Sequence, residues 1–202
     1  MKYERIQETF RYVTPGLYLL AMVLMMNFDV IKSDESLQDT TSKFSPIIIV
    51  LLPFVGFVAG YFIECIMTWV ERCLYWIRIP RPSRIVLNGN NGLYVISDEA
   101  RSAITGGEQV DNKKANRYQQ LAKQAVGEND VVSRGYHQSI MARHIFGAQL
   151  LGSIYYLAFA GGWSWGHLFY AAVIVLVVGF FWYHQTCVYM KYLFAEYGKS
   201  PS

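Results

Sequence analysis

Long apolar runs dominate this chain, and one extended polar stretch separates them into two groups. Four runs have, or nearly have, the roughly 20 residues that an α-helix needs to cross about 30 Å of hydrocarbon. They cover residues 13–31, 46–67, 145–163 and 165–188. The pattern predicts two transmembrane hairpins, in residues 1–69 and 144–202, with a short cytoplasmic tail at the end of the second.

The polar stretch, residues 70–143, is predicted to be a small insert of mixed structure. Two β-rich runs flank NGNNG and predict a hairpin-like segment over residues 84–97. Ser97 is a capping residue type ahead of a short helix over 98–105, and a second helix is expected over 110–126. The predicted fold class is an all-α membrane protein with four transmembrane helices and a small mixed α/β cytoplasmic insert between helices 2 and 3.

Composition agrees with a membrane protein. Hydrophobic residues make up 53% of the 202 and charged residues 16%, where a soluble domain has about 25% charged residues. Sixteen lysines and arginines fall in the amino-terminal stretch, the insert and the tail, against two in the other connections. The positive-inside rule therefore predicts a multi-pass protein with both termini and the insert in the cytoplasm.

The second apolar run carries three residues that recur every fourth position, Gly56, Gly60 and Glu64. This spacing places them on one helical face, where the glycines permit close approach of another helix of the same chain or of a second copy. A carboxyl inside a span is a candidate for a pore or a gate. The alternative is that Glu64 lies at the cytoplasmic interface and extends to water or pairs with Arg72.

Asn27 and Asp29 fall inside the far end of the first run, and together with Asp34, Glu35 and Asp39 beyond it they make the outer loop acidic. In an oligomer, such residues could ring the mouth of a cation pathway. A solvated outer loop explains the same residues without any pathway, because acids near the outer end of a span cost little.

The second predicted helix of the insert is basic. Its cationic residues are Lys113, Lys114, Arg117 and Lys123. They are candidates for contacts with anionic lipid headgroups or with a nucleotide or nucleic acid.

A stretch from Arg134 to Phe159 passes from cationic to apolar sequence with no proline or turn cluster, which predicts one continuous helix that couples the insert to the third span. Its candidate coupling residues are Arg134, His137, Arg143 and His144. Their spacing does not fit the arginine–histidine motif of metal-independent ribonucleases. Two histidines without a third ligand do not predict zinc, and the three isolated cysteines predict neither zinc nor disulfides. We therefore expect no catalytic residue, metal or cofactor, and an enzyme using His137 and His144 is the least favoured class.

Four short motifs, TPGLYLL, GYFIE, ANRYQQLAK and SRGYHQSIMARHIFGAQLL, follow one another along the chain. Their order resembles small four-span proteins of prokaryotic antiphage defence loci, including the accessory membrane proteins of type VI-B CRISPR effectors. The resemblance implies a bacterial inner-membrane protein and, as in some of those proteins, an oligomeric pore.

The leading functional hypothesis is therefore an oligomeric inner-membrane pore or membrane-disrupting effector controlled through the basic insert. The alternative is a non-conducting membrane sensor, scaffold or immunity protein that recruits a cytoplasmic partner. Expected partners are membrane lipids, further copies of the chain, and a cytoplasmic defence protein or nucleotide signal. Nucleic acid binding is left open.

Overall fold

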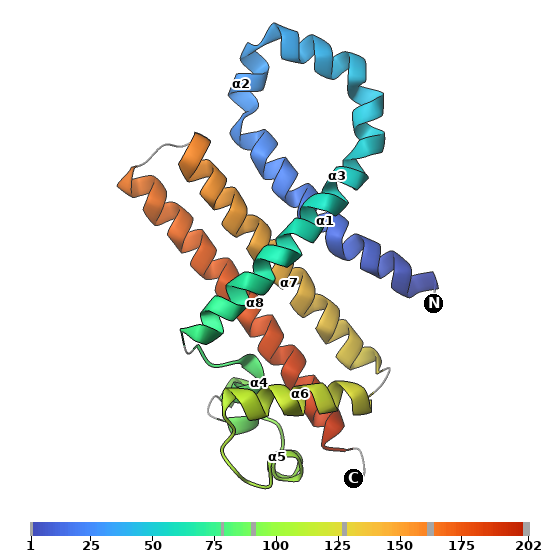
Figure 1. Cartoon of the computed structure of the whole chain (residues 1–202), viewed down its shortest axis with the longest axis vertical. Coiled ribbons are helices and arrows are strands. Elements are labelled where there is room, and N and C mark those ends of the chain that lie inside the picture. The colour runs from blue at the N-terminus through green and yellow to red at the C-terminus, as the bar shows by residue number, and fades with distance from the viewer. Residues whose placement is uncertain (1, 78, 90–91, 127–128, 161–163, 200–202) are drawn as a thin grey trace. The chain divides into compact units, whose positions relative to one another are not determined.

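The computed structural model describes residues 2–77, 79–89, 92–126, 129–160 and 164–199, and over these residues the chain has eight α-helices and no strand (Figure 1). The fold divides into two compact units. Unit 1 contains residues 1–69 and 143–179, and unit 2 contains residues 70–142 and 180–202.

The elements follow one another as helices of very different lengths. They are α1 (Lys2–Met26), α2 (Phe28–Ser33), α3 (Glu35–Trp76), α4 (Pro82–Asn88), the 3-10 helix η1 (Gly92–Tyr94), α5 (Asp98–Thr105), α6 (Asn112–Val126), α7 (Asp130–Tyr155), the π-helix η2 (Tyr156–Ala160) and α8 (Trp165–Tyr197). Helices α3, α7 and α8 each contribute residues to both units.

The prediction of four membrane spans is wrong: in the described part of the chain, two helices are long and apolar enough to cross a membrane. They are Ile49–Trp76 of α3 and Trp165–Tyr197, which is α8. The first predicted span is cut short at Met26: Asn27 separates α1 from a second helix, α2, and its side chain donates to the Val23 carbonyl oxygen (2.7 Å). The third is cut short because α7 ends at Tyr155 and a π-helix follows.

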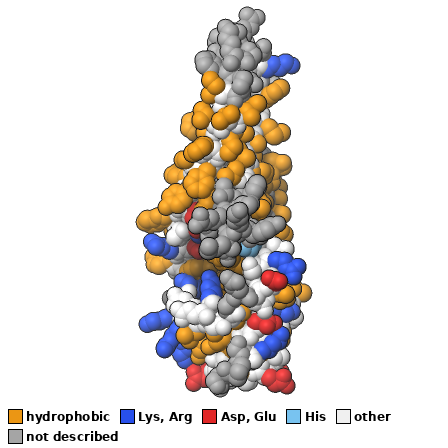
Figure 2. Space-filling view, turned by 90° about the vertical axis from the view of Figure 1, so that its right-hand side faces the viewer, with side chains coloured by type: hydrophobic (Ala, Val, Ile, Leu, Met, Phe, Trp, Pro, Cys, Tyr) orange, Lys and Arg blue, Asp and Glu red, His pale blue; other side chains and the backbone are white. Residues whose placement is uncertain are grey.

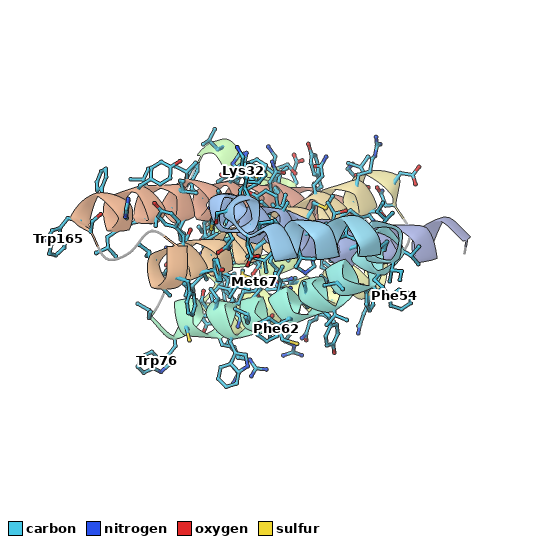
Figure 3. All side chains as sticks on the ribbon, turned by 90° about the horizontal axis from the view of Figure 1, so that it is seen from above. Lys32, Phe54, Phe62, Met67, Trp76 and Trp165 are labelled. Carbon is cyan, nitrogen blue, oxygen red and sulfur yellow. The ribbon has the colours of Figure 1, made fainter. Side chains whose placement is uncertain are left out.

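The two long apolar helices expose most of their apolar surface. Only 17% of the most apolar stretch of α3 and 11% of that of α8 is buried, whereas the central helix of a soluble domain is mostly buried. Phe54 and Phe62 of α3 are 74% and 59% exposed and point away from the neighbouring helices, while Met67 is fully buried (Figure 3). Hydrophobic side chains therefore gather on the outer surface (Figure 2), as expected of helices in contact with lipid.

The prediction of a mixed α/β insert is also wrong, because the segment predicted as a hairpin forms α4 and η1. Pro82 opens α4, where a proline's missing N–H and fixed φ suit a helix start. Gly89 closes it in the left-handed conformation (φ 65°) and donates its N–H to the Ile85 carbonyl. The apolar run in α4 spans only residues 85–87, and so short a run cannot distinguish a strand from a helix by periodicity.

Unit 2 has its own hydrophobic core, built by α4 to α6, the first turns of α7 and the last turns of α8. The core residues are Val86, Leu87, Tyr94, Ile96, Ile104, Val110, Ala115, Ala122, Val132, Cys187, Tyr189, Met190, Leu193 and Phe194. Asn88 ties α4 to the chain before α6: its amide donates to the Val110 carbonyl (3.0 Å) and accepts from the Val110 N–H (2.8 Å). Ser97 caps α5 by accepting from the Ala100 N–H.

Unit 1 is held by backbone contact between α1 and α3, which cross in Figure 1. A methyl group on Gly16 would lie 1.7 Å from the carbonyl oxygen of Gly56, and one on Gly60 would lie 1.9 Å from that of Tyr12. Only residues without a side chain allow such proximity. The contact of the Gly56–Gly60 face is thus made within one chain.

Further glycines bring α7 and α8 into the same unit. A methyl group on Gly147 of α7 would lie 2.7 Å from side-chain atoms of Ile63 and Met67 of α3. One on Gly152 of α7 would lie 2.7 Å from Met22 of α1, and one on Gly179 of α8 would lie 2.9 Å from Phe146 of α7.

Replacing Gly60 with alanine is expected to destabilise the protein, because its Cβ would overlap the Tyr12 carbonyl and force α1 away from α3. We expect a loss of about 2 kcal/mol, the usual cost of overpacking a close contact. Thermal unfolding of the purified protein in detergent measures it. The control is Gly92→Ala, because nothing lies within 4 Å of the added methyl group. Equal stability of the two variants would contradict a tight crossing.

Candidate functional site

Charged and polar side chains from three helices of unit 1 meet in one place, which we call the Glu64 cluster. Its members are Glu64 and Thr68 of α3, Arg143 and His144 of α7, and Arg11 of α1. The cluster lies within the described part of unit 1, beside the crossing of α1 and α3.

Local helix geometry explains why these residue types can meet. Glu64 and Thr68 are four positions apart and therefore share one face of α3, and the Thr68 hydroxyl donates to the Glu64 backbone carbonyl (2.9 Å). Arg143 and His144 are consecutive, so they approach the carboxylate from two directions. Gly147, one turn further along α7, contacts Ile63 and Met67 and brings the two helices close enough for these short bonds.

Each carboxylate oxygen of Glu64 has its own partner on α7. Arg143 donates from Nη1 to Oε1 at 2.6 Å, and Nε2 of His144 hydrogen-bonds to Oε2. The second guanidinium nitrogen of Arg143 donates to the Thr68 hydroxyl (3.2 Å). Arg11 approaches Oε1 at 3.9 Å, an ion-pair distance that is too long for a hydrogen bond.

The cluster is largely removed from solvent. The side chain of His144 is fully buried, that of Arg143 is 13% exposed and that of Glu64 is 22% exposed. Charges in such a place attract one another strongly, and removing one leaves its partner desolvated and uncompensated. The cluster therefore acts first as a clamp between α3 and α7.

Tyr12 of α1 closes the cluster from the third side. Its ring packs against the His144 ring with centroids 5.7 Å apart, and against Phe57 edge-to-face at 5.7 Å. Arg11 lies beside the same ring, 5.3 Å from its centroid. The aromatic side chain thus shields the buried imidazole and orients the arginine next to it.

Two of the four proposed coupling residues lie in the Glu64 cluster, and two lie in unit 2. Arg143 and His144 are bound to Glu64. Arg134 donates from Nε to the Asp130 carbonyl within α7 (3.3 Å), and the ring of His137 lies beside that of Tyr136. All four belong to one uninterrupted α-helix, α7.

Of the two proposed pathway residues, Asn27 has hydrogen-bond partners other than Glu64, on α1 and α7. The Asn27 amide donates to the Tyr155 hydroxyl (2.8 Å), which joins the end of α1 to the end of α7. The backbone of Asp29 is part of α2, and the side chain of Asp29 is not among those that the structure describes. Asn27 thus has a packing role within the chain.

The four basic residues of α6 have different surroundings. Lys114 forms an exposed ion pair with Glu108 (3.0 Å), and this hydrogen bond raises the pKa of Lys114. The ammonium of Lys123 lies 5.5 Å from the Tyr136 ring and 6.0 Å from the Tyr189 ring, and its desolvation lowers the pKa of Lys123. Lys113 and Arg117, one turn apart and both exposed, form the outer basic face of α6.

Three residues at the site were not singled out by the sequence analysis. Thr68 carried a usable signal, because it lies one helical turn after Glu64. Arg11 and Tyr12 carried none, because nothing in the sequence places the start of α1 beside α7. Among the described residues, no group of three or more histidine, cysteine, aspartate and glutamate side chains is placed to hold a metal ion.

Replacing Glu64 with glutamine is expected to cost about 3 kcal/mol of unfolding free energy, since it removes the carboxylate that the largely buried Arg143 and His144 both bind. Removing both partners in Glu64→Gln/Arg143→Met should restore part of that loss, which a double-mutant cycle in detergent measures. The matched control is Glu108→Gln, which breaks the exposed pair with Lys114 and should cost less than about 1 kcal/mol. Equal costs at the two sites would contradict a buried clamp.

Comparison with known proteins found no relative of this chain: no protein-family model, no curated protein and no solved structure matches it.

Proposed function

We propose that this protein is a non-conducting scaffold or sensor of the bacterial inner membrane, anchored by α3 and α8, that recruits a cytoplasmic partner through unit 2. It acts without a catalytic residue or cofactor. The sequence resemblance to membrane proteins of antiphage defence loci supports a role in such a system.

The observation that carries the proposal is that the features suggesting a pore are engaged inside one chain. The Glu64 carboxylate is bound by Arg143 and His144. The Gly56–Gly60 face is covered by α1 at backbone contact. A side chain already paired and a face already packed are poor candidates for the lining of an aqueous path.

The distribution of charge supports a cytoplasmic unit 2. Its α6 exposes Lys113 and Arg117, and lysines and arginines near membrane spans favour the cytoplasmic side. The last turns of α8 contribute Leu193 and Phe194 to the core of unit 2, which supports the same side for the carboxyl terminus. A folded module with an exposed basic face suits an acidic protein partner.

The second candidate is the oligomeric pore or membrane-disrupting effector. In its favour, α3 carries a carboxyl within its apolar stretch, and ionisable residues inside spans mark ion pathways in many membrane proteins. In this mechanism a signal on unit 2 would have to favour an arrangement in which Glu64 leaves Arg143, and the ligand would need a higher affinity for that arrangement.

Reconstitution of the purified full-length protein into liposomes separates the two candidates. We expect ion and dye efflux equal to that of protein-free vesicles, and no loss of membrane potential when the protein is expressed in bacteria. Efflux above that baseline that is lost in Glu64→Gln would exclude the non-conducting scaffold and support the pore.

Recruitment is tested by affinity purification of the full chain from cells that contain its genomic neighbours. We expect a stable soluble partner that is lost from the Lys113→Glu/Arg117→Glu variant and kept by Lys199→Glu, a charge reversal elsewhere in unit 2. Retention of the partner by the double variant would exclude the basic face of α6 as the docking surface. Labelling of introduced cysteines from each side of the membrane tests the predicted cytoplasmic position of both termini and of unit 2.

A further inference from the structure

A pocket of about 570 Å³ lies within unit 2, lined by the chain leading into α5, by α5 itself and by the end of α8. Its apolar walls include Val95, Ile96, Ala100, Ala103 and Ala195. Small-molecule sites in proteins have volumes of about 300–1,000 Å³ and combine apolar walls with a few polar groups. The size and lining of this pocket therefore suit a small ligand.

Small side chains on two facing segments leave this space open. Ala100 and Ala103 lie three positions apart on α5, and Ala195 of α8 and Gly198, which follows α8, have the same spacing. Residues three apart share a helical face. A methyl group on Gly198 would lie 2.6 Å from the Cβ of Ala100, so the two segments are in close contact beside the pocket and hold its walls in place.

Lys191 supplies a charged group to the pocket. It is half-buried and lies one turn before Ala195 on the same face of α8. Among the described residues it has no hydrogen-bond or ion-pair partner, whereas Lys199, which also lines the pocket, is bound to Glu196 (2.7 Å). A half-buried ammonium attracts an anion more strongly than an exposed one does, because less water screens it.

The length of α8 places Lys191 beyond the hydrocarbon of the proposed membrane. The helix has 33 residues and is therefore about 50 Å long, whereas the hydrocarbon layer is about 30 Å thick. The neighbours of Lys191 in the last turns, Met190 and Leu193, pack in the core of unit 2. The pocket thus belongs to the part of the protein that is proposed to face the cytoplasm.

The charges at the pocket select a ligand with a single negative charge. Lys191 can pair with one anionic group, while the exposed carboxylate of Glu99, in the same lining, repels further negative charge. A phosphate monoester carries a charge of about −1.5 to −2 at neutral pH and is a poorer match than a carboxylate. The apolar walls favour a ligand whose remaining atoms are apolar, because binding removes both surfaces from water.

We propose that this pocket binds a small monocarboxylate with an apolar body, whose carboxylate pairs with Lys191 and whose body packs between α5 and the end of α8. The bound ligand would join the two segments and stabilise unit 2, since a ligand that binds the folded state alone stabilises it. The ligand would be the signal of the proposed membrane sensor. That last step rests on the proposed function, and binding itself does not.

The test measures binding of octanoate to the purified full-length protein by equilibrium dialysis, with protein-free detergent as the blank. We expect saturable binding that weakens about tenfold in Lys191→Gln, which removes the charge, and is largely kept in Lys191→Arg. Acetate, without the apolar body, and octan-1-ol, without the carboxylate, should each bind more weakly than octanoate. The control is Lys114→Gln, at an exposed lysine of unit 2 paired with Glu108, and it should bind like wild type.

A second variant, Ala103→Phe, fills the pocket without changing its charge and should also weaken octanoate binding about tenfold. Thermal unfolding of each variant shows that it is folded. The proposal is overturned by an absence of saturable octanoate binding, by undiminished binding in Lys191→Gln or Ala103→Phe, or by equal weakening in Lys114→Gln. Displacement of octanoate by ATP at equal concentration would also overturn it, in favour of a site for polyanions. Liposome efflux and partner capture need no octanoate, so failure of the proposed function is distinguishable from failure of this site.

Discussion

The bond between Glu64 and the consecutive Arg143 and His144 is the constraint on which unit 1 depends. It joins residues 79 and 80 positions apart in the chain, and it is formed where little solvent reaches the charged groups. A desolvated carboxylate tolerates few arrangements, so α3 and α7 are fixed in register along their contact. The Thr68 hydroxyl reinforces this register by accepting from the same arginine.

Glycine contacts make that bond possible. Helices in an apolar environment gain nothing from hydrophobic burial against one another and associate through close packing and polar contacts. Here Gly16, Gly56 and Gly60 place α1 on α3, and Gly147 places α7 on α3. Tyr12 then fills the space between the three helices and covers His144. Close helix packing and charge interactions thus hold the same three helices, α1, α3 and α7, together.

The two units differ in where their apolar and charged side chains lie, and this difference bears on function. In unit 1, apolar side chains such as Phe54 and Phe62 point outward while the polar groups bind one another. In unit 2, the apolar side chains are gathered in a core and the charged side chains of α6 lie outside. This contrast suits an anchor that is fixed by lipid and a helical module that offers its surface to water and to a partner.

The sequence by itself determined the features that depend on neighbours along the chain. The apolar stretches of α3 and α8, the shared face of Gly56, Gly60 and Glu64, and the Ser97 cap all follow from spacing and residue type. Tertiary structure decided what covers that face, what binds the carboxylate and that the 84–97 segment is helical. The physical reason is that a short apolar run fits a helix or a strand equally well until its neighbours are placed, and a charge some 80 residues away leaves no local trace.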